Sequence, residues 1–422
     1  MSEPESVLTG VWADLVGQES AVAVLRRAVA AWQQGLVGTD TAPDAPRAHA
    51  MSHAWLLTGP PGSGRSNAAR AFAAALQCPH GGCGACNACR TSLSGAHPDV
   101  TLVATETLSI GVDEVRELVR QAAMSPSRGR GQVVVVEDAD RITERGADAL
   151  LKAIEEPAAR TVWLLCAPTP DDVIVTIRSR CRRLHLATPR DEAVARLLVE
   201  RDGIDPDLAG AAARAAQGHI GRARRLARDP EARQRREAIL ALPTTVRDLG
   251  DCLTAAQRLV DDATAEAEAA TAEVEARERA ELERALGYGT TGARPRSGRA
   301  ALRDLEAEQK ARVKRLQRDA LDRVLTELTS FHRDVLAVQT GAVRPEEEAG
   351  LRGARLVNST MAPQIHQVAA ATTPEQVVGR LDAILEAREA LESNVAPLLA
   401  MEALLVRLAG LDRTGAGPSR GR

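Results

Sequence analysis

Residues 59–66 read Gly-Pro-Pro-Gly-Ser-Gly-Arg-Ser, which has the spacing of a nucleotide phosphate-binding loop. In that pattern backbone N–H groups cradle the phosphates, and a lysine reaches the β- and γ-phosphates. Arg65 stands at the lysine position, and its planar guanidinium binds phosphate as a fork rather than as a point charge. The sequence leaves two interpretations open, a bound nucleotide or an inherited turn that holds none. The candidate contacts are Gly59, Gly62, Gly64, Arg65 and Ser66.

The acidic pair that an ATPase needs is also altered. In a working site an apolar strand ends in Asp-Glu, where the aspartate organises Mg²⁺ and the glutamate positions water. Here the apolar residues 133–136 are followed by Glu137 and Asp138, the reverse order. Glutamate is one methylene too long for the metal position, and aspartate is one too short for the base. We therefore expect a damaged catalytic site.

Four of the seven cysteines lie close together in a glycine-rich segment. Cys78, Cys83, Cys86 and Cys89 have the spacing C-x4-C-x2-C-x2-C, which suits tetrahedral zinc. Four thiolates leave no open position on the ion, so the site is expected to be structural. Free or redox-active thiols are the alternative.

Arg180 lies in a Ser-Arg-Cys stretch after a loop at 173–178. Taken alone, one arginine in an arginine-rich chain is ordinary surface charge. In an oligomeric ATPase, an arginine at this place would point toward a neighbouring subunit rather than toward its own phosphate loop.

The elements that must position these residues are those of a parallel α/β sheet. Between 54 and 186, continuous apolar runs alternate with helical patterns, as in buried parallel strands joined by helices. We predict strands at 54–58, 100–103, 133–136 and 162–166, and helices at 64–76, 111–123 and 143–155.

The remainder of the chain is expected to be helical. A small bundle of short helices at 191–228 precedes an all-helical region that contains a charge-dense, alanine-rich stretch at 263–284. We interpret that stretch as part of a projecting helical hairpin; a solvated, partly disordered insertion is the alternative. The expected domains are a nucleotide-binding-type domain at 1–188 with its cysteine module at 78–89, a helical lid at 189–230, an all-helical domain at 231–412 with an arm at about 255–310, and a tail at 413–422.

Composition narrows the function classes. The net charge of −3 gives no global basic signature, and the aromatic content of 2% argues against base-stacking surfaces. Neither a secretory start nor an apolar run long enough for a membrane span is found. Because the cysteines are clustered, a reduced cytoplasm is the expected location, and no membrane partner is expected.

These features together resemble the AAA+ clamp-loader family of the bacterial DNA polymerase III, and within it the delta-prime branch. The similarity covers about the first 230 residues. It runs through residues 11–18, the phosphate loop, the cysteine cluster, the Leu-Leu-Lys-Ala-Ile-Glu-Glu-Pro stretch at 150–157, and Thr-Ile-Arg-Ser-Arg-Cys at 176–181.

The resemblance implies an AAA+ module with a zinc loop and a helical lid, and an all-α collar through which subunits form an open ring. In that family, motor subunits hydrolyse ATP to load a sliding clamp on primed DNA, and delta-prime is a stator that does not hydrolyse. By the resemblance Arg180 completes a neighbour's ATP site. The implied partners are tau/gamma-type motor subunits and delta-type subunits, with the clamp and primed DNA reached through the complex at the replisome.

The departures from a motor subunit agree with one another. Besides Arg65 and the Glu137-Asp138 pair, the polar residue expected at the end of the fourth strand falls at Ala167-Pro168, and the lid arginine falls at Gly221. Two alternatives remain. The chain could be an active AAA+ ATPase, either a divergent motor or a DNA-repair enzyme, or its arm could make it mainly a scaffold.

Overall fold

The computed structural model describes residues 8–35, 50–105, 109–286, 296–343, 356–393 and 395–411. The internal contacts divide the chain into two compact units, Met1–Arg228 and Asp229–Arg422. In the part of the chain so described, no helix combines the length and the apolar character that crossing a membrane requires.

The first unit is built on a five-stranded parallel sheet with the order β2-β3-β4-β1-β5. Successive residues of a strand point to opposite faces. On one face Trp55 and Leu57 pack with helices α1 and α2, and on the other Leu56 packs with α4 and α5. The strands are β1 (Ala54–Thr58), β2 (Val100–Val103), β3 (Gln132–Val136), β4 (Thr161–Ala167) and β5 (Arg182–His185), and the helices are α1 (Glu19–Gln33), α2 (Arg65–Gln77), α3 (Asn87–Leu93), α4 (Val112–Ala122) and α5 (Glu144–Glu155).

The prediction of a parallel α/β sheet is confirmed, and β1 and β2 have the predicted bounds. Strand β5 was missed because it is polar. It pairs with β1 through Arg182, Arg183, Leu184 and His185, and of these only Leu184 is buried. The loop expected at 173–178 is wrong in part, since Val175–Arg178 forms the short helix α6.

Three short helices complete the first unit, and this confirms the predicted bundle. They are α7 (Asp191–Glu200), α8 (Pro206–Ala216) and α9 (Ile220–Arg228). Asp202, in the turn after α7, connects this turn to α9, because its carboxylate pairs with Arg224 at 2.7 Å and with Arg228 at 3.2 Å, both on α9. Arg201 pairs with Asp14, which ties the bundle to the N-terminal segment. We call α7–α9 the lid.

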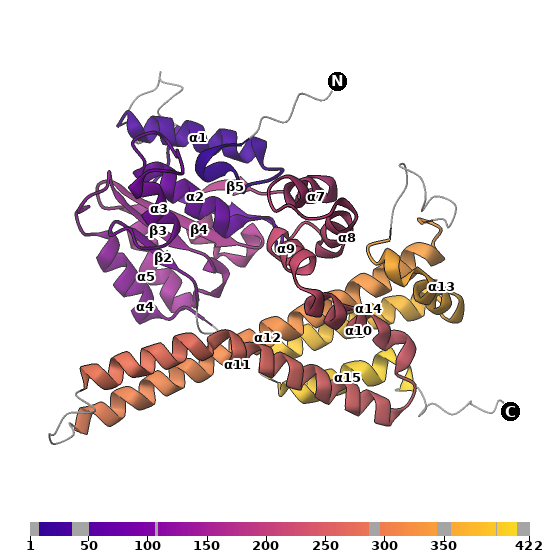
Figure 1. Ribbon diagram of the computed structural model, residues 1–422. Coiled ribbons are helices and arrows are strands. Elements are labelled where there is room, and N and C mark those ends of the chain that lie inside the picture. The colour runs from indigo at the N-terminus through magenta and orange to yellow at the C-terminus, as the bar shows by residue number, and fades with distance from the viewer. Residues whose placement is uncertain are drawn as a thin grey trace, which may run out of the picture. The chain divides into compact units, whose positions relative to one another are not determined.

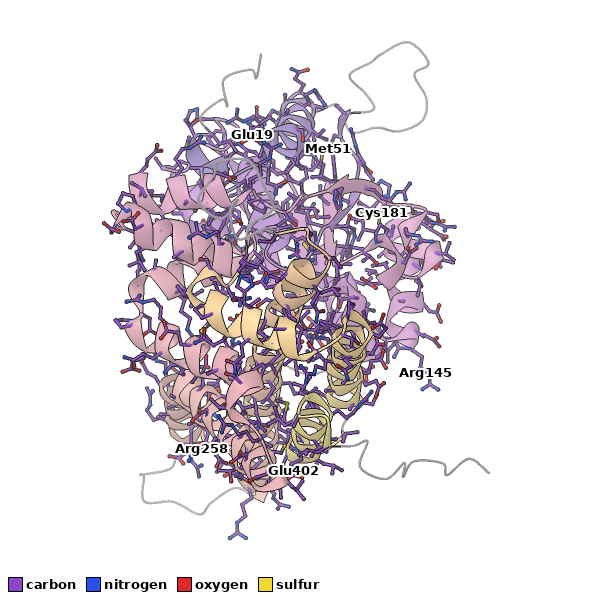
Figure 2. The ribbon with its side chains drawn as sticks, turned by 90° about the vertical axis from the view of Figure 1, so that its right-hand side faces the viewer. Glu19, Met51, Arg145, Cys181, Arg258 and Glu402 are labelled. Carbon is purple, nitrogen blue, oxygen red and sulfur yellow. The ribbon has the colours of Figure 1, made fainter. Side chains whose placement is uncertain are left out.

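The second unit is helical throughout its described residues. Apolar side chains of α10, α12, α13 and α14 form one cluster, and those of α11, α12, α14 and α15 form another. Figure 2 labels Arg258 on α11 and Glu402 on α15, two helices that pack together. The helices are α10 (Pro230–Thr245), α11 (Leu249–Ala285), α12 (Arg296–Gln339), α13 (Ala362–Ala371), α14 (Pro374–Glu392) and α15 (Pro397–Leu408).

Helices α11 and α12 form a long hairpin whose far half projects beyond the other helices of this unit (Figure 1). We call this far half, residues 263–286 and 296–317, the arm. The residues of α11 that are buried in the arm are small: Ala263, Ala267 and Thr271. Polar contacts cross the seam of the arm as well: Arg312 pairs with Glu278 at 3.0 Å, and Gln317 donates to Thr264 Oγ1 at 2.6 Å. The low apolar content of the arm is therefore compatible with an ordered hairpin.

Candidate functional site

The phosphate loop joins the end of β1 to the start of α2. Gly59, Gly62 and Gly64 have φ values of 153°, 86° and 87°, a region that favours glycine. At Gly59 a Cβ atom would lie 2.3 Å from the carbonyl oxygen of Leu186, so that no side chain fits. The loop therefore has the glycine-dependent geometry that its sequence predicts, with helix α2 beginning at Arg65.

Arg65 does not extend from the loop as a free cation. Its guanidinium donates to the carbonyl oxygen of Gly59 in the same loop. The lid residue His219 packs against Gly62, where an added Cβ would lie 2.6 Å from the histidine Cβ. Burial and the nearby Arg222 lower the pKa of His219, which favours its neutral form. The lid thus places the His219 imidazole against the phosphate loop.

Both members of the acidic pair make contacts within the fold. Glu137 forms an ion pair with Arg70 of α2, with Nε and Oε1 2.5 Å apart, and its side chain is only 12% exposed. Asp138 Oδ2 accepts a hydrogen bond of 3.1 Å from the backbone N–H of Thr105, at the end of β2. Nearby, burial and the charge of Asp138 raise the pKa of Asp140. The carboxylates expected at a metal site thus link strand ends and helix α2.

The other two altered positions also lack a side chain for phosphate recognition. Ala167 is fully buried at the end of β4, and the carbonyl oxygen of Pro168 accepts a hydrogen bond of 3.1 Å from the N–H of Gly59. Gly221 lies in the first turn of α9. Backbone and apolar groups therefore occupy the two positions at which the resemblance led us to look for polar side chains.

Gln18, the last residue of the 11–18 stretch that carries part of the resemblance, was not predicted to have a functional or structural role. This buried side chain donates from Nε2 to the carbonyl oxygens of Ser63, at 3.3 Å, and Ala187, at 2.6 Å. Its Oε1 accepts from the N–H of Ala187 at 3.2 Å. Gln18 consequently joins the N-terminal segment, the phosphate loop and the segment that leads into the lid.

The four clustered cysteines converge, as their spacing predicts. Their sulfur atoms all lie within 4.8 Å of one another, and Cys78 Sγ is 3.7 Å from both Cys83 Sγ and Cys86 Sγ. Four sulfurs placed tetrahedrally about 2.3 Å from a zinc ion would be separated by about 3.8 Å. The donor set and the spacing therefore fit a tetrahedral metal ion.

Local backbone groups favour a thiolate at this cluster. Burial acts to raise the pKa of Cys78, but N–H groups of Cys83, Gly82 and His80 direct hydrogen bonds to its sulfur, and the pKa falls to about 6. The cluster also holds the start of the chain, because the N–H of Val11 donates to the carbonyl oxygen of Gly82 at 3.1 Å.

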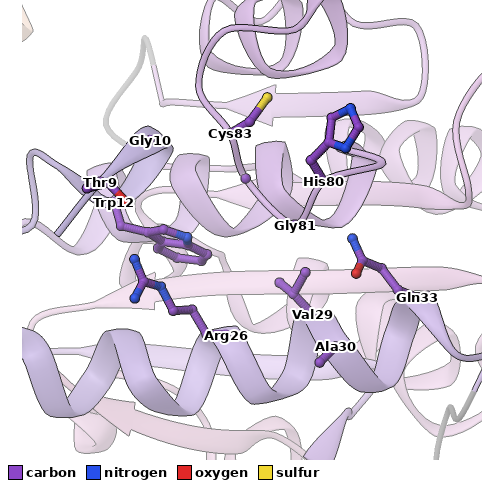
Figure 3. Close-up of a pocket in the computed structure, with 11 residues that line it drawn as sticks. Thr9, Gly10, Trp12, Arg26, Val29, Ala30, Gln33, His80, Gly81 and Cys83 are labelled. Atoms are coloured by element: carbon purple, nitrogen blue, oxygen red, sulfur yellow. The ribbon is translucent and has the colours of Figure 1, made fainter.

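A pocket of about 560 Å³ lies beside this cluster (Figure 3). Its walls come from the first described residues, helix α1 and the cysteine loop, and include Trp12, Arg26, His80 and Cys83. None of its lining residues belongs to the phosphate loop. The pocket is thus separate from the nucleotide-type site.

Arg180 follows helix α6 and is partly exposed. Its Nη2 pairs with Glu155 Oε1 at 2.6 Å, and its Nη1 donates to the carbonyl oxygen of Thr176 at 2.8 Å. The side chains of Arg180 and Glu155 are 40% and 39% exposed. This ion pair therefore joins two stretches that carry the resemblance, residues 150–157 and 176–181.

Arg180 and the phosphate loop lie at opposite ends of the sheet along the direction of its strands. Arg180 precedes β5, in which Arg182 pairs with Trp55 near the start of β1, whereas the loop follows Thr58 at the other end of β1. A strand rises about 3.3 Å per residue, so the four steps from Trp55 to Gly59 span about 13 Å. Arg180, which lies just before β5, is therefore at the end of the sheet remote from the phosphate loop of its own chain.

Comparison with known sequences gives relatives for the first unit. Residues 44–190 match the family described as DNA polymerase III, delta subunit. The delta' subunit of DNA polymerase III from Pseudomonas aeruginosa is 39% identical over 152 residues, which cover 35% of this chain and 46% of that protein. The Escherichia coli delta' subunit is 35% identical over 177 residues, covering 40% and 53% of the two chains. The gamma/tau subunit from Mycobacterium tuberculosis is 32% identical over 204 residues, 46% of this chain and 32% of that protein. This chain thus spans between about a third and a half of these relatives.

Solved structures give weaker likenesses. A gamma subunit-related protein from Thermotoga maritima has a TM-score of 0.39 at 15% identity, covering 92% of this chain and all of that one. A RuvB variant from the same organism has a TM-score of 0.36 at 16% identity, covering 56% and 67% of the two chains. The sheet order and the glycine-rich loop, rather than these scores, define the fold of the first unit.

Proposed function

We propose that this chain is a stator of a clamp loader. The premise is that residues 44–190 match the DNA polymerase III delta-subunit family and that delta' subunits are among the relatives of the chain. In this role it does not hydrolyse ATP itself. It assembles with tau/gamma-type motor subunits and a delta-type subunit, and it assists the loading of a sliding clamp on primed DNA.

The state of the phosphate loop supports the absence of hydrolysis. The cation at the lysine position is bound to the loop's own carbonyl oxygen, and Glu137 is paired with Arg70. Hydrolysis needs a lysine on the phosphates, a Mg²⁺ ligand and a residue that orients water. The contacts of Arg65, Glu137 and Asp138 engage these three groups elsewhere, so even a nucleotide held by backbone N–H groups would not be turned over.

The position of Arg180 is the observation that carries the proposal. It lies where the strands of the sheet begin, whereas its own phosphate loop lies where they end, and its side chain is exposed enough to reach another chain. An arginine supplied in trans to a phosphoryl-transfer site raises the rate by about 10³–10⁵. An exposed ion pair is worth about 1 kcal/mol or less, so releasing Arg180 from Glu155 costs little against that gain.

The cysteine cluster supports a second, structural role. We assign zinc to Cys78, Cys83, Cys86 and Cys89, on the basis of the four-thiol donor set and the sulfur spacing. When bound, the ion would crosslink the end of α2, the loop that follows it and α3. This module would stabilise the first unit and take no part in phosphoryl transfer.

The test is ATPase activity, measured for the purified chain alone and after mixing with the motor and delta-type subunits. We expect no turnover by the chain alone, turnover in the mixture, and a loss of turnover at the adjacent site by a factor of about 10³ or more with Arg180→Ala. Ring assembly, checked by size-exclusion chromatography, is expected to persist. Arg178→Ala, which alters the arginine paired with Asp171 in the same segment, is the matched control and is expected to keep the activity.

The competing function is that of a working ATPase, and the same assay distinguishes it from the stator role. Robust hydrolysis by the chain alone that is abolished by Arg65→Ala would refute the stator role. Full activity of the mixture with Arg180→Ala would assign the arginine to surface charge and remove the trans-acting part of the proposal.

A further inference from the structure

The arm, which the function proposed above does not use, carries two kinds of basic residue. The first kind faces the seam or a neighbouring carboxylate. Arg312 pairs with Glu278 at 3.0 Å, Arg279 lies 3.4 Å from Glu306, and Arg277 lies 3.6 Å from Glu273. These arginines hold the hairpin together or balance its acidic side.

The second kind forms a row on α12: Arg299, Arg303, Lys310 and Lys314, all exposed. With 3.6 residues per turn, these positions fall within a sector of about 60° on the helix and span about 22 Å along it. We call this row the basic stripe. Two of the chain's three lysines lie in it.

The stripe is chemically distinct from its surroundings. Among the residues that the structure describes, none of its four side chains forms an ion pair, in contrast to the arginines that cross the seam. No acid falls within its sector: Asp304 and Glu308 lie further round the helix, and Glu306, just outside it, is paired with Arg279. Four cations thus face solvent in line, without local neutralisation.

We propose that the basic stripe binds the phosphate backbone of double-stranded DNA. A duplex carries about one negative charge per 1.7 Å of its axis, so that about 13 charges lie alongside a stripe of about 22 Å. A straight row of cations matches such a continuous line of charge better than it matches the localised acidic patch of a folded protein. The two arginine and two lysine side chains make backbone contacts and carry no sequence preference.

The charge of the whole chain makes this contact weak and dependent on salt. At a net charge of −3 the rest of the molecule does not attract DNA. Four phosphate contacts give a slope of about −3.6 in log K against log salt, which corresponds to a roughly 150-fold loss of affinity between about 50 and 200 mM salt. Dissociation constants near 10⁻⁴–10⁻⁶ M are typical of such non-specific contacts.

The experiment uses the full chain and a fluorescein-labelled duplex of about 30 base pairs, with fluorescence anisotropy read across that salt range. The variant carries Arg299→Gln, Arg303→Gln, Lys310→Gln and Lys314→Gln, which keep good helix formers on α12. We expect a loss of affinity of more than about tenfold at the lowest salt and a slope reduced by about one for each contact removed. Circular dichroism checks that the variant stays helical.

A matched control removes four positive charges elsewhere on the surface, outside the arm, from Arg116, Arg120, Arg145 and Arg258, each exposed and changed to Gln. This control has the same net charge as the stripe variant but keeps the basic stripe, so it is expected to keep most of the affinity and the slope. Equal losses in the two variants would mean that only net charge matters and would overturn the proposal. Tighter binding of poly-glutamate than of the duplex would overturn it too, because the stripe would then be a protein-binding surface. Neither readout depends on ATP turnover, so this proposal and the role of Arg180 fail independently.

Discussion

Removing the four-cysteine site gives the sharpest single test of the metal assignment. The perturbation is Cys83→Ser combined with Cys86→Ser, which takes away the exposed half of the cluster and leaves the buried Cys78 and Cys89 in place. We expect one equivalent of zinc in the wild-type chain purified under reducing conditions and none in the variant, since two thiolates do not complete a tetrahedral site.

The size of the stability change follows from linkage. An ion that binds only the folded state, at a free concentration of 100 times its dissociation constant, contributes about 2.7 kcal/mol. For a unit of the size of Met1–Arg228, each kcal/mol shifts the melting temperature by about 2–4 °C. Loss of the ion is therefore expected to lower the melting temperature of the first unit by about 5–11 °C.

Tryptophan fluorescence can follow this unit alone, because all four tryptophans, Trp12, Trp32, Trp55 and Trp163, lie within it. Trp12 is 2% exposed, beside the segment in which Val11 bonds to Gly82, so its emission is expected to shift to longer wavelength when the cysteine loop opens. Cys252→Ala, at a buried cysteine of the second unit, is the control and is expected to keep the zinc and the melting curve. Metal-free wild-type protein, or zinc that persists in the double variant, would refute the assignment.

Two further predictions concern buried charges. Glu327→Ala is expected to destabilise the second unit by about 3–5 kcal/mol, because Arg236, 2.9 Å away and 10% exposed, would be left without its carboxylate. Urea unfolding followed by circular dichroism would measure this loss of stability, and a change below about 1 kcal/mol would contradict the prediction. Burial acts to raise the pKa of Asp99, but the N–H groups of Ser127, Arg128 and Gly129 outweigh it and hold the pKa below its ordinary value. The carboxylate therefore stabilises the fold above the unfolded-state pKa of about 3.9, and this contribution is lost as pH falls through the lower folded-state value. Asp99→Asn is expected to cost about 1.5–3 kcal/mol at pH 7 in tryptophan-monitored unfolding, with a gap from wild type that narrows below about pH 4; a gap independent of pH would contradict the cause.

The sheet was largely predictable from the sequence because its inner strands are continuous apolar runs. β1 and β2 had the predicted bounds, and β3 and β4 differ from theirs by one residue at one or both ends. β5 escaped prediction because its position at the sheet edge allows arginine and histidine side chains in three of its four places. Its pairing with β1 depends on contacts more than 120 residues apart, which no local pattern reveals.

The candidate site divides in a similar way. The four cysteines were predictable, since a metal site whose ligands are close in sequence leaves its spacing in the chain. The side chains and backbone groups that bind the altered ATPase residues could not be predicted. The ion pair of Glu137 with Arg70, for example, joins residues that are 67 positions apart, and no local pattern reveals such a contact. The sequence indicated that the acidic pair was in the wrong order. Only the structure reveals that the Arg70 side chain and the backbone N–H of Thr105 now bind those carboxylates.

The composition of the arm's seam has a mechanical consequence. A hairpin closed by leucines exposes a large apolar surface when it opens, and such a surface is prone to aggregation. In the α11 half of the arm the buried side chains are the small Ala263, Ala267 and Thr271. Polar pairs such as Gln317 with Thr264 cross the seam, and leucines of the arm such as Leu302 and Leu305 are only half-buried. Partial opening would therefore expose less new apolar surface than the opening of a leucine-closed hairpin, and the tip can separate and close again at a smaller free-energy cost. The hairpin can therefore project far from its core and still tolerate bending.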